Sequence, residues 1–292
     1  MALINKESVK KRMGTRLAAN GLAKFLFILA TCFSLLVLGV LIYRILSEGL
    51  PYLSLDFITN FASRMPERAG IWAALLGTIW VMAVTAPVSF ILGVGTAIYL
   101  EEYAKKNAFT KFVQINISNL AGVPSIVFGL LGLTIFVRLL GLGSSVLAGG
   151  LTMSLLILPV IVVASQEAIR TVPREIREAS FGMGATKWQT IRRIVFPAAL
   201  PGILTGTILA LSRAVGETAP LLVLGALAYV AFVPENIFSQ FTVLPIQLYN
   251  WTSRPQEEFH MIAASGIIIL LIILLIMNSI AVLIRNKFHK RF

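Results

Sequence analysis

Long uncharged runs alternate with short polar segments along most of this chain. The uncharged runs lie at 25–43, 69–100, 112–137, 139–166, 194–212, 218–234 and 259–284. A helix that spans a bilayer needs about 20 apolar residues, so most of these runs are long enough to cross alone. Only Arg213 and Glu217 carry charge between the fifth and sixth runs. We interpret these two runs as one crossing that passes through both charges.

This pattern predicts an all-α polytopic membrane protein with six transmembrane helices, near 25–46, 72–99, 116–137, 147–166, 202–224 and 261–284. Composition agrees, because charged residues make up 13% of the chain, about half the usual fraction. With both termini inside, 19 Lys and Arg residues fall in inner segments and five in outer segments. The positive-inside rule therefore predicts cytoplasmic termini and a location in the cytoplasmic membrane. The formal net charge of +12 follows from this topology, so no nucleic-acid partner is expected.

We divide the chain into three parts. Residues 1–71 hold an N-terminal tail, the first span and an external segment that fits either a lid or a plain connector. Residues 72–284 form the core, and residues 285–292 form a basic tail. Small residues permit close helix contact in lipid, and the candidates are Gly93, Gly95, Gly129, Gly132, Gly202 and Gly206. Prolines kink helices, and those within predicted spans are Pro87, Pro124, Pro159 and Pro220.

The polar loop at 167–197 carries its own helix signals. Pro173 fits the first position of a helix, where its missing N–H costs nothing. Gly184 lies where that helix can end. Thr186 and Gln189 have the spacing of a capping box that starts a second helix. From the residues alone, a docking element for a partner and an ordinary solvated loop are about equally plausible.

A second informative segment follows at 213–220. Arg213 lies about 12 residues into the predicted fifth span, roughly 18 Å along it and close to mid-membrane. A charge there costs roughly 2.5–3.5 kcal/mol on insertion scales and is by default a candidate facing a cavity. Glu217 can pair with Arg213, either as a structural ion pair or to hold the guanidinium for a passing oxyanion. Thr218 could add a hydroxyl, and Ser125 could line the pathway or only pack.

Several chemistries find no support in the sequence. It contains no G-x-x-x-x-G-K-[ST] segment, so we expect no ATP site of that kind in this chain. Two histidines and one cysteine are too few for a conventional zinc site. We therefore expect no catalytic residues, metal or cofactor in this chain, and a membrane enzyme is only a weak alternative. Arg213 and Glu217 would also suit a secondary transporter or channel that works without ATP.

The polar loop resembles the EAA motif of bacterial ABC importer permeases, which reads Glu-Ala-Ala, three residues, Gly, nine residues, Ile-x-Leu-Pro. The matching positions are Glu178, Ala179, Gly184, Ile194 and Pro197. Ser180 and Phe196 depart from the motif but keep size class or apolarity. The resemblance implies the type I (MetI-like) permease fold, whose loop docks on a separate ATPase subunit that binds ATP and Mg. It also implies that Glu178 and Ala179 lie on the docking helix and that Gly184 makes the turn.

Two further stretches resemble the phosphate-specific (Pst) permeases. They are Arg-Ala-x-Gly-Glu-Thr-Ala-Pro at 213–220 and Asn-Leu-Ala-Gly-Val-Pro-Ser-Ile-Val-Phe-Gly at 119–129. The Ala-Pro after Gly-Glu-Thr favours the A permease over its C partner. The resemblance implies phosphate import with a second permease (PstC-like), two ATP-binding subunits (PstB-like) and an external phosphate-binding protein (PstS-like). A permease for another oxyanion, such as sulfate or molybdate, is the nearest alternative.

Overall fold

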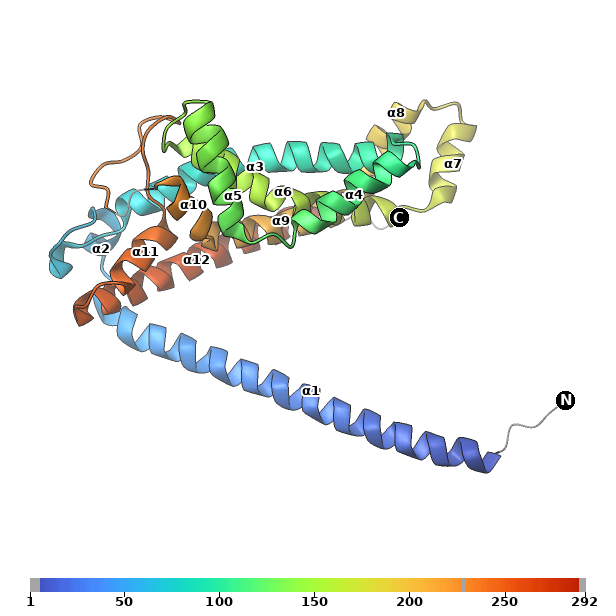
Figure 1. Cartoon of the computed structure of the whole chain (residues 1–292), viewed down its shortest axis with the longest axis horizontal. Coiled ribbons are helices and arrows are strands. Elements are labelled where there is room, and N and C mark those ends of the chain that lie inside the picture. Colours follow the sequence, from blue (N-terminus) through green and yellow to red (C-terminus); the bar gives the residue numbers. More distant parts are fainter. Residues whose placement is uncertain (1–5, 227–228, 289–292) are drawn as a thin grey trace.

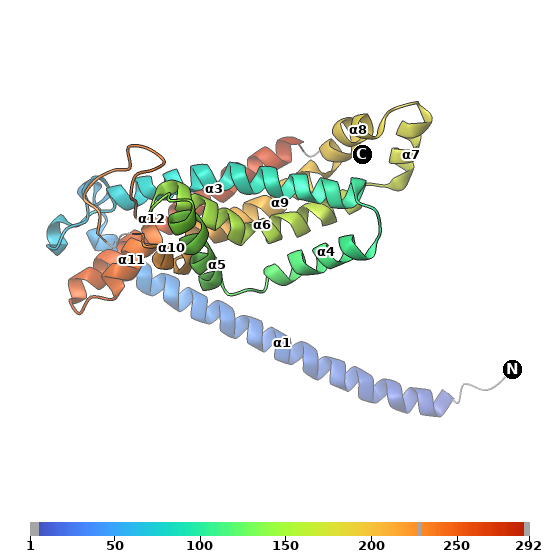
Figure 2. The same cartoon turned by 45° about the horizontal axis from the view of Figure 1, so that its top comes forward.

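The computed structural model describes residues 6–226 and 229–288, and all regular elements within these ranges are helical. The first helix, α1 (Lys6–Gly49), meets the bundle at its C-terminal end, where the Ser265 hydroxyl donates to the Gly49 carbonyl at 2.7 Å. Elsewhere it runs apart from the other helices (Figures 1 and 2). Its apolar surface is therefore open to lipid or to another subunit.

Four long helices form the bundle. They are α3 (Trp72–Ile98), α6 (Val146–Arg170), α9 (Phe196–Gly216) and α12 (Glu257–Phe288). α6 is the central helix, because it packs against both α3 and α9 and most of its apolar stretch is buried. These helices and α1 are the five in the described ranges that are long and apolar enough to span a membrane alone.

Glycines allow the bundle helices to approach closely. A Cβ at Gly93 of α3 would lie 2.7 Å from the Ile161 side chain of α6. A Cβ at Gly206 of α9 would lie 2.3 Å from the Ala164 Cβ. Gly129, Gly132 and Gly202 have similarly close neighbours. The prediction is wrong only at Gly95, where an added Cβ would meet nothing within 4 Å.

The third predicted span, 116–137, is not one straight helix. α4 (Ala108–Leu120) is followed by α5 (Ser125–Gly132) and a π-helix (Leu133–Leu139), and the two parts are bent by 106°. Pro124 explains the break, because it has no N–H to donate to the Leu120 carbonyl. The bent pair brings the number of candidate crossings in the described residues to six.

The fifth predicted span, 202–224, is wrong in its limits. The crossing helix ends with α9 at Gly216, and Glu217 is extended (φ −77°, ψ 128°). α10 (Ala219–Leu224) then follows as a separate helix. Pro220 cannot donate to the Gly216 carbonyl, so the helix stops before Glu217. A single straight crossing through both charges is therefore excluded.

One end of the bundle, which we call the outer end, is covered by short elements. These are two 3₁₀ turns (Leu50–Tyr52 and Pro66–Arg68), α2 (Leu55–Thr59) and α11 (Leu244–Thr252). The Phe57 ring of α2 lies 6.0 Å from that of Trp251 of α11, and both side chains are buried. The segment between α1 and α3 is thus a packed cover rather than a plain connector, and the segment that holds α11 also folds back onto the bundle.

The opposite end, which we call the inner end, carries the 167–197 loop. Here lie α7 (Arg174–Gly182), α8 (Lys187–Thr190) and a π-helix that extends α3 (Tyr99–Tyr103) (Figure 1). The starting end of α1 and the final turns of α12 also point this way (Figures 1 and 2). The two described ends of the chain therefore lie at the same end of the molecule.

Candidate functional site

The 167–197 loop folds as two short helices joined by a tight turn, as predicted. α7 directly follows Pro173, and Gly184 takes a φ of +83°, which favours glycine. The Gln189 N–H donates to Thr186 Oγ1 at 3.3 Å, and the Thr186 N–H donates to Gln189 Oε1 at 2.8 Å. The predicted capping box is thus confirmed.

Ser180, where the motif has alanine, has a specific partner. Its hydroxyl lies 2.9 Å from the hydroxyl of Thr190, and both side chains are buried. A buried hydroxyl without a hydrogen bond is costly. The Ser180 hydroxyl therefore gives the buried Thr190 hydroxyl its hydrogen-bond partner, and this bond links α7 to α8.

The outward side of the loop is exposed and partly apolar. Glu178 and Ala179 of α7 are both exposed, in line with a docking surface. Met183 is 89% exposed, Trp188 58% and Phe181 48%. Three large apolar side chains exposed within one short loop are typical of a segment that contacts another protein or a membrane.

The last two motif residues, Ile194 and Pro197, lie where the loop leads into α9. Ile194 is half-buried in a π-helix (Ile191–Val195), and Pro197 is exposed in the first turn of α9. A proline ring collides with the carbonyl four residues earlier in an ordinary helix. The wider π-turn in front of Pro197 accommodates it, so the helix continues unbroken.

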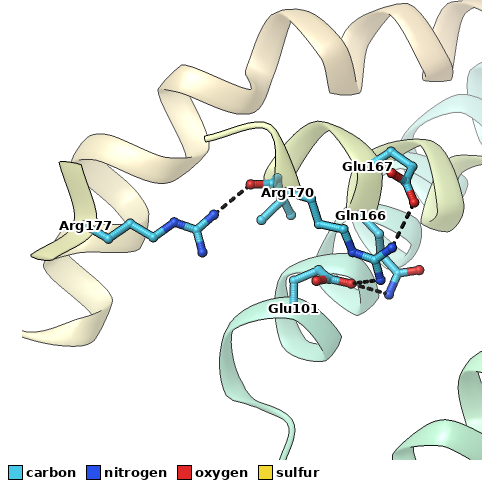
Figure 3. A network of polar contacts seen from close by, with 6 residues as sticks. Glu101, Gln166, Glu167, Arg170 and Arg177 are labelled. Atoms are coloured by element: carbon cyan, nitrogen blue, oxygen red, sulfur yellow. Dashed lines mark hydrogen bonds and ion pairs between the residues drawn. The ribbon is translucent and has the colours of Figure 1, made fainter. Parts of the chain in front are cut away.

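A polar network that the sequence analysis missed ties the inner ends of α3 and α6 together (Figure 3). Glu101 Oε1 accepts from Arg170 Nη2 at 2.6 Å and from Gln166 Nε2 at 2.9 Å. Arg170 Nη1 also donates to Glu167 at 2.9 Å. Glu101 is largely buried, with 17% of its side chain exposed, so these donors compensate its charge.

Arg177 extends the network to α7. Its Nη2 donates to the Ile169 carbonyl at the end of α6 at 2.7 Å (Figure 3). Its Nη1 lies 2.8 Å from Glu102 Oε1, although the angles are not those of a hydrogen bond, so this is a Coulomb contact. Lys187 Nζ of α8 lies 5.0 Å from the centre of the Tyr103 ring. Three successive residues of the α3 extension therefore contact α6, α7 and α8.

The predicted pair of Arg213 and Glu217 forms, although the helix ends between them. Arg213 Nε lies 3.3 Å from Glu217 Oε1. The Glu217 side chain is 19% exposed and lines a small cavity against α3 and α6, whereas the Arg213 side chain is 60% exposed. The Glu217 carboxylate is therefore buried within the bundle, and the Arg213 guanidinium that it holds lies at the surface of the single chain.

Arg213 lies level with the middle of α6. It lines a small cavity with Val123 of the α4–α5 bend and with Leu156 and Ile157 of α6. The two α6 residues lie near the midpoint of a 25-residue helix. This position agrees with the mid-membrane depth expected for Arg213. It also places the bend between α4 and α5 beside the Arg213 guanidinium.

The other two predicted pathway residues flank this region. Thr218 is half-buried at the N-terminus of α10, next to Glu217. Ser125 is half-buried at the start of α5 and does not line the Arg213 cavity. The two stretches nevertheless touch, because a Cβ at Gly129 would lie 2.8 Å from Pro220 Cα. The roles of Thr218 and Ser125 stay predictions.

Comparison with known proteins identifies the family. Residues 89–291 match the family described as "Binding-protein-dependent transport system inner membrane component". The chain is 32% identical over 261 residues to the "Probable ABC transporter permease protein YqgI" of Bacillus subtilis, covering 85% of this chain and 88% of that protein. It is 37% identical over 224 residues to the "Phosphate transport system permease protein PstA 1" of Mycobacterium tuberculosis, covering 76% and 73%. It is 31% identical over 274 residues to PstA of Xylella fastidiosa, covering 92% and 93%.

Solved structures agree on the fold. A bacterial ABC transporter involved in alginate import superposes with a TM-score of 0.68 at 16% identity, covering 96% of this chain and all of that chain. The inward-facing MetNI methionine ABC transporter gives 0.61 at 19% identity, covering 75% and 98%. These identities support the fold alone, and they confirm the predicted MetI-like permease architecture. The chain belongs to the family of binding-protein-dependent transport system inner membrane components and is a membrane transport subunit.

Proposed function

We propose that this chain is a permease subunit of an ATP-driven importer of inorganic phosphate. The observation that carries the proposal is the identity of 37% and 31% to proteins named as phosphate transport permeases, over 76% and 92% of the chain. The exposed guanidinium of Arg213 offers suitable chemistry. A guanidinium fork binds oxyanions through two oxygens.

The pathway is proposed to lie between this chain and a second, similar permease. Arg213 is exposed on the single chain, and a charge at mid-membrane depth is tolerated only when it faces protein or water. Helix α1 runs apart from the bundle (Figure 1), and its exposed apolar side chains are a further place for that partner to bind. The outer cover of α2 and α11 would receive the external phosphate-binding protein.

ATP and Mg are proposed to bind to a separate pair of ATPase subunits at the inner end, which would face the cytoplasm. The surface formed by Phe181, Met183 and Trp188 supports this arrangement, because it is apolar and exposed outside the membrane-spanning helices. The chain itself would then supply no hydrolytic residue.

We propose the following sequence of movement. Closure of the ATPase subunits shifts α7, and the contacts of Arg177 with Glu102 and of Lys187 with Tyr103 carry the shift to α3. α6 follows through Glu101 and Arg170. The helices move as rigid bodies and expose Arg213 alternately to the outside and to the inside.

Two alternatives remain in view. Sulfate and molybdate also present paired oxygens, so the guanidinium alone does not favour phosphate over them. An ATP-independent transporter would need no docking loop, and the ordered α7–α8 turn with its exposed apolar residues speaks against that.

Crosslinking tests the docking surface. Cys32 is the chain's single cysteine and lies exposed on α1, so Cys32→Ser gives a cysteine-free background. Met183→Cys in this background should crosslink to an ATP-binding subunit in native membranes. Unmodified chain, with Cys32 alone, is the control and should give no such product. A preparation that carries phosphate while nothing is bound at Met183→Cys would overturn the proposal.

A further inference from the structure

A large basic hollow lies at the inner end, where α3, α4 and α6 meet. It has a volume of about 640 Å³ and is lined by five cationic side chains, namely Lys105, Lys106, Lys111, Arg170 and Arg174. An adjoining hollow of about 340 Å³ shares Lys106, Arg170 and Arg174 with it. Because they share these walls, we call the two hollows together the inner basic pocket. Arg213 lines neither part.

The positive charge of this pocket is not balanced by the protein. Glu101 is the one carboxylate among the residues that line it, and Arg170 and Gln166 already bind that carboxylate. The ion pairs found in the described residues include none with Lys105, Lys106, Lys111 or Arg174. Like charges held close together repel one another. An anion in the pocket would relieve that repulsion.

Topology alone does not explain the convergence. The positive-inside rule accounts for basic residues at this end of the molecule, but not for their meeting in one hollow. Lys105 and Lys106 come from the turn after α3, Lys111 from the first turns of α4, and Arg174 from the start of α7. Together with Arg170 of α6, the fold thus brings cations from four segments around one space.

We propose that the inner basic pocket binds a phosphate group. Lysine ammonium and arginine guanidinium groups are the usual ligands of phosphate oxygens. Basic pockets between membrane helices on this side bind anionic lipid headgroups. Phe109 and Phe112 of α4 are 72% and 64% exposed beside Lys111, and they offer an acyl chain a surface next to the charges. The phosphate group therefore comes from an anionic phospholipid or from free phosphate at the inner face.

The position gives the bound group a mechanical consequence. Arg174 opens α7, and Arg170 pairs with Glu101 of the α3 extension. A phosphate held between Arg174 and the lysines would join α4 to the docking loop. The bound phosphate group would then stabilise the complex by holding α4 and α7 together.

Lipid retention by the purified complex tests the first source. The assembled complex, without ATP or phosphate, is titrated with phosphatidylglycerol or phosphatidylcholine and bound lipid is counted by native mass spectrometry. Lys105→Gln, Lys106→Gln and Lys111→Gln are combined; all three lysines are exposed, so packing is preserved. The matched control removes equal charge elsewhere with Arg16→Gln, Lys24→Gln and Arg285→Gln. We expect at least about tenfold weaker phosphatidylglycerol binding in the pocket variant and less than about twofold change in the control.

Inorganic phosphate tests the second source. Lipid-depleted complex carrying Arg213→Gln, which removes the proposed pathway group, is titrated with phosphate and its thermal unfolding is followed. If phosphate raises the unfolding temperature of this complex, and the rise disappears when the three pocket lysines are also replaced, the pocket binds free phosphate. The proposal is overturned if neither phosphatidylglycerol nor phosphate distinguishes the pocket variant from the charge-matched control. Because neither assay involves transport, failure here leaves the proposed import function untouched.

Discussion

Arg177 of α7 lies 2.8 Å from Glu102 at the end of α3. The contact links the 167–197 loop to the π-helix that extends α3, 75 positions earlier in the chain. Only 21% of the Arg177 side chain and 10% of the Glu102 side chain are exposed. Removing one partner of a pair so little exposed to solvent costs more than removing one partner of a surface pair.

Glu102→Gln should uncouple the loop from α3. Removing one partner of a buried pair costs roughly 3–5 kcal/mol. We expect a cost at the lower end of that range, because Arg177 still donates a hydrogen bond to the Ile169 carbonyl. The measurement is phosphate carried per ATP hydrolysed in reconstituted vesicles, which should fall several-fold.

A matched control exists on α1. Arg44 and Glu48 form an ion pair whose side chains are 73% and 38% exposed. Such pairs contribute about 0–1 kcal/mol, so Glu48→Gln should leave the transport ratio unchanged. An equal loss in both variants would show that the effect is not specific to the loop.

Gly184→Val should disturb the turn between α7 and α8. The glycine has a φ of +83°, and a residue with a Cβ in the left-handed region costs about 1–2 kcal/mol. Uptake and ATPase stimulation should both drop while the chain still assembles. Gly182→Ala is the control, because Gly182 is helical and an added Cβ meets nothing within 4 Å. Wild-type coupling in Gly184→Val would exclude a role for the turn.

Arg213→Gln should abolish phosphate uptake without loss of assembly. Gln keeps hydrogen-bonding capacity but lacks the charge that attracts an oxyanion. Arg213→Lys keeps the charge without the fork, and we expect intermediate uptake. Assembly is followed by co-purification of the partner subunits, and uptake by labelled phosphate. Normal uptake by the Gln variant would refute the assigned role.

Glu217→Gln should weaken both assembly and transport. The carboxylate is 19% exposed and lies 3.3 Å from Arg213 Nε, so its loss leaves the guanidinium without its counter-charge at mid-membrane depth. Complex yield and uptake should fall together. Wild-type behaviour in both assays would mean that Arg213 has a different partner.

Gly129→Ala should destabilise the contact between α5 and α10. The added Cβ would lie 2.8 Å from Pro220 Cα and its carbonyl oxygen. Overpacking of this kind costs about 1–3 kcal/mol, so thermal unfolding should occur at lower temperature. Gly95→Ala, with nothing within 4 Å, should change the unfolding temperature little. Equal behaviour of the two variants would contradict the packing described.

The local signals of the 167–197 loop sufficed to predict its structure. A capping box is a contact between neighbours in sequence, so Thr186 and Gln189 predict it without tertiary information. Gly184 and Pro173 act through their own backbone restrictions. All of these residues lie where the sequence placed them.

The interrupted crossings were harder to predict from prolines alone. Pro87 and Pro159 lie inside unbroken helices, whereas Pro124 and Pro220 follow breaks. A glycine stands within the four residues before each breaking proline, at Gly122 and Gly216. Glycine weakens the helix in the same turn in which proline removes a hydrogen bond, and this combination was the available signal.

The polar network around Glu101 could not be predicted from the hydropathy pattern. The residues that meet there are far apart in the sequence, and the π-helix that aims them is not visible in an apolar pattern. The signal was two adjacent acids, Glu101 and Glu102, at a span end where basic residues are expected. Acids in that setting need basic partners, here Arg170 and Arg177.

ATP-dependent uptake of labelled phosphate is the most direct test of the central claim, that this chain is the moving conduit of a phosphate importer. The complete complex is reconstituted in vesicles with ATP enclosed on the ATPase side, and labelled sulfate is run in parallel. We predict phosphate accumulation that requires ATP, is lost with Arg213→Gln and exceeds sulfate accumulation at equal concentration. Phosphate entry at the same rate without ATP, or preferential sulfate uptake, would contradict the account.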